Sequence, residues 1–132
     1  MKYMIQFLPP VAGVLFIAFT ACRIAAAGVS RKNTWLFPAG LSLAFFVFSL
    51  SAVVVEGPIA FWAEHTRNLW GNQIWFDLLL AVAIAWYFVV PKARAVGMSL
   101  APWLALVVGT GSIGVLAMVA RLLFLEAQDV DG

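Results

Sequence analysis

Charged side chains are scarce in this chain. Asp, Glu, Lys and Arg make up 11% of its 132 residues, whereas hydrophobic residues make up 64%. Soluble globular domains carry about 25% charged residues, so this chain has too few of them to cover a core with a wetted surface. The shortage of charge predicts that lipid, rather than water, surrounds most of the protein.

Cysteine and histidine are almost absent as well. The single cysteine, Cys22, excludes a disulfide within the chain, and its apolar surroundings favour the role of a small buried hydrophobe. The single histidine, His65, has no ligand spacing around it, so we predict no metal site. The net charge of +2 comes without a basic stripe or a stacking platform, and we predict no nucleic-acid partner.

Long apolar runs occupy most of the chain, at about residues 5–28, 35–55, 73–90 and 101–125. Each run approaches the roughly 20 residues that a helix needs to cross a bilayer. Backbone groups in lipid must bond within their own segment, so we predict four helices. The expected fold class is all-α: an integral membrane four-helix bundle, with one domain over residues 1–132 and a tight C-terminal helical hairpin.

Two segments need separate interpretation. The first run, with Lys2 before it and three alanines near its end, resembles a signal peptide, but we interpret it as the first transmembrane helix. The longest connection, residues 56–72, alternates apolar and polar blocks and holds Trp62 and Trp70. We predict that this connection lies along the membrane surface as a short amphipathic segment.

Basic residues in the short loops predict the orientation. Arg31 and Lys32 lie in the first loop, and Lys92 and Arg94 lie in the third. The positive-inside rule places these loops in the cytoplasm and therefore both termini in the periplasm. The expected location is the bacterial inner (cytoplasmic) membrane, which the chain crosses several times. Together with Arg23, these four residues form a basic collar that we expect to bind lipid headgroups.

Ionisable residues inside apolar runs need a partner or a role. Asp77 lies near the start of the third predicted helix and Arg121 near the end of the fourth, so antiparallel packing would bring them to a similar depth. We predict a structural ion pair between them, joined by Glu56. Glu64 and His65 would approach from the long connection. An acid–base or polar ligand site at the outer rim is the alternative.

Small residues recur in the fourth predicted helix, where Gly109, Gly111 and Gly114 lie close together. Small residues let another backbone approach, which favours close packing of the third and fourth helices. The alternative is a ligand slot whose walls include Trp86 and Tyr87. No cofactor follows from these residues alone, although a flat carotenoid, quinone or chlorin would fit such a slot.

Several short motifs in the second half occur in a defined order. They are Trp75-Phe76-Asp77, Trp86, Pro91-Lys92-Ala93-Arg94-Ala95 with Gly97, Pro102-Trp103, Gly111-Ser112-Ile113-Gly114 and Arg121. This order resembles an uncharacterised family of small bacterial four-helix membrane proteins, although Ile113 and Gly114 stand where that family commonly has a proline. The order is also distantly similar to neoxanthin-synthase-like membrane proteins. The first resemblance implies a fold, and the second implies an isoprenoid or carotenoid ligand.

Residue patterns that support catalysis are missing from the sequence. It offers no serine–histidine or cysteine–histidine pair and no redox dithiol, so we name no catalytic residue and lean away from an enzyme. Small size and little polar surface favour a non-enzymatic accessory or scaffold subunit of a larger membrane complex. Its partners would be membrane lipids and other membrane-protein subunits. The alternative is a protein that binds or modifies a carotenoid, a quinone or another isoprenoid lipid.

Overall fold

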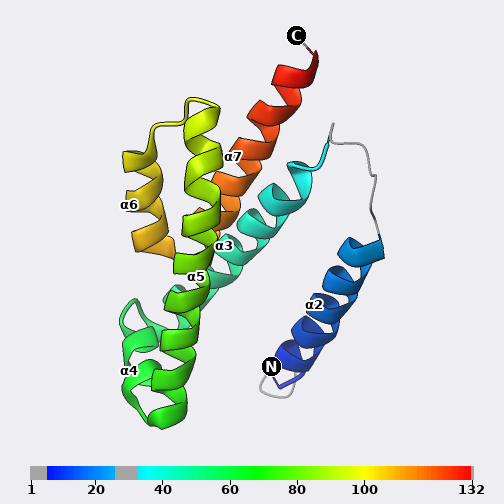
Figure 1. Cartoon of the computed structure of the whole chain (residues 1–132). Helices are drawn as coiled ribbons and strands as arrows, with labels where there is room; N and C mark the ends of the chain where they lie inside the picture. Colours follow the sequence, from blue (N-terminus) through cyan, green and yellow to red (C-terminus); the bar gives the residue numbers. More distant parts are fainter. Residues whose placement is uncertain (1–5, 26–32, 132) are drawn as a thin grey trace. The chain divides into compact units, whose positions relative to one another are not determined.

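The computed structural model describes residues 6–25 and 33–131, and all regular structure in those ranges is helical (Figure 1). The chain divides into two compact units, Met1–Ser30 and Arg31–Gly132. The first unit contains α2 (Leu8–Ala25). The second contains α3 (Leu36–Glu56), α4 (Ala60–Thr66), α5 (Leu69–Ala95), α6 (Leu100–Thr110) and α7 (Ser112–Asp131). The predicted all-α class is thus confirmed for the described residues.

The first unit contains one described helix, α2, which is apolar and exposed. Pro9 and Pro10 lie in its first turn, where a proline removes no hydrogen bond that the helix would make. Cys22 is exposed rather than buried, because α2 packs on no other described helix of its unit. Residue 5 and residues 26–28 of the predicted first helix lie outside the described residues.

Two described helices, α3 and α5, are long and apolar enough to cross a membrane by length and composition. They contain 21 and 27 residues, and their most apolar windows are 11% and 0% buried within the protein. The core helix of a soluble protein would be mostly buried, so the exposure of α3 and α5 is consistent with membrane association. Four crossings are not shown, since α6 is only 11 residues long.

The fourth predicted helix is divided in two at Gly111, which is a correction to the sequence analysis. Gly111 has φ +59°, a backbone conformation that residues with a Cβ rarely adopt. Its N–H donates to the carbonyl of Val107 at 2.7 Å, and its own carbonyl accepts from the N–H of Val115 at 3.2 Å. The chain therefore reverses here while the backbone groups of the turn stay hydrogen-bonded.

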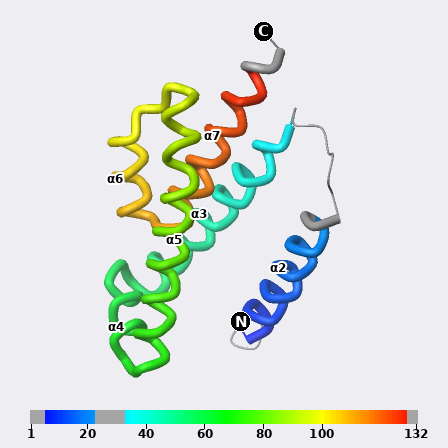
Figure 2. The backbone as a smooth tube through the Cα atoms, in the orientation of Figure 1, coloured from blue at the N-terminus to red at the C-terminus, as the bar shows by residue number. Residues whose placement is uncertain are grey.

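Beyond Gly111, α7 returns toward the end of the unit from which α6 came (Figure 2). Gly114 lies against the α6 backbone, where a Cβ would be 2.8 Å from the Cα of Val107. Near its other end, α7 reaches the start of α3, where the rings of Trp35 and Phe124 meet edge to face at 5.4 Å. The last turns of α7 therefore lie at the same end of the unit as the α5–α6 connection, not at the opposite end as predicted.

The core of the second unit lies where α5, α6 and α7 meet. Its buried members are Ala93, Met98, Met118 and Leu122. Partly buried side chains pack around them: Trp86, Val89, Val96, Leu100, Trp103 and Leu125. This core covers only the last turns of α5, and α4 packs on its first turns, so the middle of the helix stays largely exposed.

The ends of α5 differ from the prediction. The helix begins at Leu69, where the side chain of Asn68 accepts a hydrogen bond from the N–H of Gly71 at 2.9 Å and so caps it. It continues through Pro91 and ends before Gly97, whose φ of +74° suits a glycine after a helix. The predicted surface connection at 56–72 consequently contains α4 and the first turn of α5.

Candidate functional site

The predicted ion cluster is not assembled. Asp77, Arg121 and Glu56 are all exposed, and among the side chains that the structure describes they form no ion pair with one another. Glu64, which was expected to approach this cluster, pairs instead with Arg67: Arg67 Nη2 lies 3.4 Å from Glu64 Oε2 on the exposed surface.

The reversal at Gly111 explains why Asp77 and Arg121 do not meet. Leu122, the neighbour of Arg121, packs in the core with Ala93 near the end of α5. Asp77 lies about four turns before Ala93, or roughly 24 Å along the helix axis. The predicted pairing required a fourth helix that crosses completely, and α7 does not continue in that direction.

Arg121 instead lies over an aromatic ring. Its guanidinium carbon is 5.5 Å from the ring centroid of Phe124, a cation–π geometry. Phe124 in turn contacts Trp35, directly before α3. This pair of rings and the arginine mark the place where α7 meets the start of α3.

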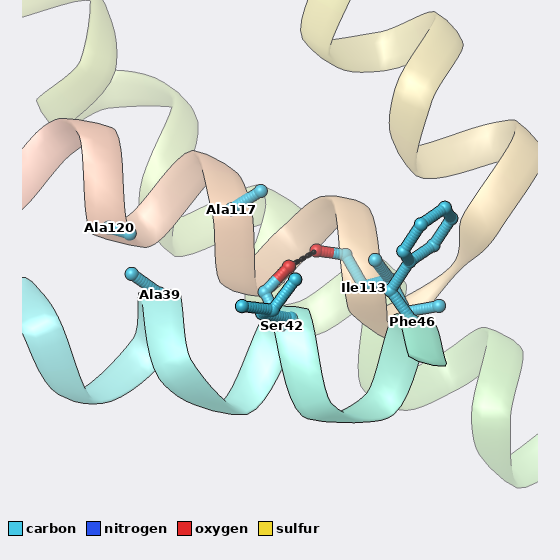
Figure 3. A pocket seen from close by; sticks show the side chains of 7 residues that line it. Ala39, Ser42, Phe46, Ile113, Ala117 and Ala120 are labelled. Carbon is cyan, nitrogen blue, oxygen red and sulfur yellow. Dashed lines mark hydrogen bonds between the residues drawn. The ribbon is translucent and has the colours of Figure 1, made fainter. Parts of the chain in front are cut away.

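An open groove of about 320 Å³ runs between α3 and α7 (Figure 3). Its lining residues are Ala39, Ser42, Leu43, Phe46, Ile113, Ala117 and Ala120. The three alanines leave the space, since a methyl group is all that each extends from its helix. The lining is apolar apart from the hydroxyl of Ser42.

Ser42 also holds the two helices together. Its hydroxyl donates to the carbonyl of Ile113 at 3.0 Å, between residues 71 positions apart in the sequence. The side chain is buried, with 9% of its surface exposed. A buried hydroxyl needs such a partner, so this bond fixes the register of α3 against the first turn of α7.

The residues of the predicted ligand slot lie in different surroundings. Trp86 is half-buried against the core, whereas the side chain of Tyr87 is 74% exposed. Gly109 faces open space, Gly111 forms the turn, and Gly114 is buried against α6. The expected close approach at a glycine does occur at Gly114, but the partner is α6 rather than the third predicted helix.

Sequence reasoning missed the groove between α3 and α7. A signal was present, because Ala39 and Ser42 are three residues apart, as are Ala117 and Ala120. Residues at this spacing share a helix face, so each pair marks a face with little side-chain volume. The sequence did not reveal that these two faces meet.

The basic collar is described only in part. Lys92 and Arg94 are exposed in the last turn of α5. The side chain of Arg23, and Arg31 and Lys32, lie outside the described residues.

The ring of Trp75 on α5 contacts three rings of α4 where the two helices pack together. The ring centroids of His65 and Trp75 are 4.9 Å apart, and those of Phe61 and Trp62 lie 6.2 and 6.5 Å from Trp75. Gly71 lets the backbones approach, because a Cβ there would meet the carbonyl of Glu64. No group of three potential metal ligands occurs within the described ranges. The ring contacts pack α4 onto α5.

Comparison with known proteins identifies no matching family model, no matching curated protein and no matching solved structure. The resemblances on residues 75–121 therefore stay predictions.

Proposed function

We propose that this protein is a small multi-pass protein of the bacterial inner membrane and a non-enzymatic accessory subunit of a larger membrane complex. The observation that supports this proposal is the uncovered apolar surface of α3 and α5. Neither helix has the polar face that water requires.

The surface of α3 shows this most directly. Four consecutive side chains, Phe45, Phe46, Val47 and Phe48, are 44%, 42%, 55% and 55% exposed. Successive residues of a helix point about 100° apart, so these four cover most of the circumference. Lipid or helices of another subunit must cover the parts of α3 that α7 leaves exposed.

The proposed arrangement has two full crossings, α3 and α5. At about 1.5 Å per residue, α6 is only about 16 Å long, roughly half of the 30 Å hydrocarbon core. We therefore infer that α6 and α7 enter the membrane, turn at Gly111 and leave on the side they came from. Irregular backbone is tolerated at such depth where protein covers it, and Gly111 is half-buried and hydrogen-bonded.

Lys92 and Arg94 indicate which side of the membrane the end of α5 faces. The positive-inside rule places the end of α5 in the cytoplasm, and the last turns of α7 lie at that same end. The C-terminal part of α7 is accordingly cytoplasmic in this proposal, which replaces the periplasmic position expected from four crossings.

Site-specific photo-crosslinking in cells tests the accessory role. A photoreactive residue at Phe48, on the uncovered part of α3, should yield a discrete adduct with another membrane protein. The same residue at Val108, which is exposed on the shorter α6, serves as the matched control and should crosslink less to that protein. Lipid adducts alone at Phe48, together with a stable partner-free monomer in mild detergent, would refute the accessory role.

A further inference from the structure

An exposed cation lies beside the groove between α3 and α7. Arg121 directly follows the lining residue Ala120 and is four residues from Ala117, so it shares a helix face with the lining of the groove. Its guanidinium lies over Phe124 and has no carboxylate partner among the side chains that the structure describes.

The groove itself is a poor site for water. Its volume equals that of roughly ten waters in the liquid. The lining offers them only the hydroxyl of Ser42, whose hydrogen is already donated to Ile113. Hydrocarbon fills such a space without losing hydrogen bonds, so an apolar chain is the better occupant.

The groove and the arginine are arranged as a bound lipid would require. Ala39 and Ala120 lie at one end of the groove, and Phe46 and Ile113 lie at the other (Figure 3). The Ala120 end is next to Arg121, which lies near the Trp35–Phe124 pair at the start of α3. Tryptophan is enriched at the depth of the lipid headgroups. The charge therefore lies at the headgroup end and the apolar groove extends from it.

We propose that this groove binds one hydrocarbon chain of an anionic phospholipid, whose phosphate pairs with Arg121. A guanidinium binds a phosphate through two charge-assisted hydrogen bonds, which a zwitterionic lipid offers less favourably because its own cation competes. The inference rests on the membrane location in the proposed function and is independent of any partner subunit.

Native mass spectrometry of the full-length protein tests the inference. The delipidated protein is titrated with phosphatidylglycerol, phosphatidylcholine and a neutral polyprenol. We expect phosphatidylglycerol to bind tightest. Arg121→Gln should weaken that binding roughly tenfold, the loss expected for one charge-assisted contact. Arg67→Gln removes an exposed cation at the other end of the unit, after α4, and should change the affinity little.

The groove is tested separately from the charge. Ala117→Leu fills the space and should reduce binding of phosphatidylglycerol, whereas Ala105→Leu, at an exposed position on α6, should not. Thermal unfolding of each variant checks that it folds, and Arg121→Gln remains informative if Ala117→Leu does not.

Three results would overturn the inference: equal binding of the two phospholipids, equal losses in Arg121→Gln and Arg67→Gln, or tighter binding of the polyprenol. Absence of the protein from the membrane fraction would instead refute the proposed function.

Discussion

At the residue scale, one side chain and one missing side chain set how α7 packs. The absent Cβ of Gly114 lets α7 approach the backbone of α6 at Val107. The hydroxyl of Ser42 then joins the first turn of α7 to α3 through Ile113. Each contact depends on a few atoms, so each predicts a specific effect of substitution.

Gly114→Leu should destabilise the protein by about 1–3 kcal/mol, the usual cost of overpacking. Any Cβ there would be 2.8 Å from Val107 Cα, closer than two carbon atoms can lie. Gly109→Ala in the same glycine-rich stretch is the control, because nothing lies within 4 Å of its Cβ position. Unfolding in detergent with increasing denaturant measures both variants. Equal stability of the two variants would contradict the close approach of α6 and α7.

Ser42→Ala should lower the free energy of unfolding by about 0.5–1.5 kcal/mol, because the hydrogen bond to Ile113 is lost in a buried position. Ser51 is the matched control on the same helix. Its hydroxyl bonds only to Val47 of its own helix and is exposed, so Ser51→Ala should be nearly neutral. If both substitutions have the same effect in the unfolding measurement, Ser42 does not join the two helices.

At the scale of elements, the break between α6 and α7 decides which residues become neighbours. It places Arg121 near the start of α3, beside Phe124 and Trp35. A continuous helix would have carried Arg121 toward Asp77, near the beginning of α5. One turn at Gly111 therefore separates two charges that a straight helix would have brought together.

A double-mutant cycle on Asp77→Ala and Arg121→Ala measures that separation. Distant residues act independently, so the coupling energy should be below about 0.5 kcal/mol. Trp35→Ala and Phe124→Ala form the positive control, since their rings touch and should couple by about 0.5–1.5 kcal/mol. A coupling between Asp77 and Arg121 as large as that of the aromatic pair would favour the continuous helix instead.

At the scale of the whole second unit, the returning α7 determines where its C-terminal end lies. The long helices α3 and α5 connect the two ends of the unit. The α6–α7 pair begins and ends at the end where α5 stops. Only a continuous fourth helix would place the C-terminal end of α7 opposite to the α5–α6 connection. Labelling from either side of a membrane distinguishes these arrangements.

For this test, Cys22 is replaced by serine and single cysteines are introduced at exposed positions. In sealed vesicles, an impermeant maleimide should label Ser99→Cys, in the α5–α6 connection, and Gln128→Cys, near the end of α7, from the same side. Arg67→Cys, after α4, should be labelled from the opposite side. Labelling of Gln128→Cys together with Arg67→Cys would mean that α6 and α7 cross as one helix.

Much of the helical structure was predictable from the sequence. The uncharged run at residues 35–55 corresponds closely to α3, and the run at 73–90 lies within α5. The extra turns of α5 were missed because they lie outside the uncharged run: Asn68 caps the helix before that run, and the helix continues through Pro91 after it. The ion cluster of Asp77 and Arg121 was not recovered, because its geometry assumed the path of the fourth helix.

Local chemistry alone determined that this chain forms long apolar helices with little polar surface. A run without charge leaves backbone groups to bond within a helix, and this requires no knowledge of the neighbours. Tertiary structure alone decided the reversal at Gly111, the neighbour of Arg121 and the groove beside Ser42. Glycine adopts φ values of either sign at similar cost, so contacts elsewhere decide which sign Gly111 takes. Here those contacts are Gly114 against α6 and Ser42 with Ile113.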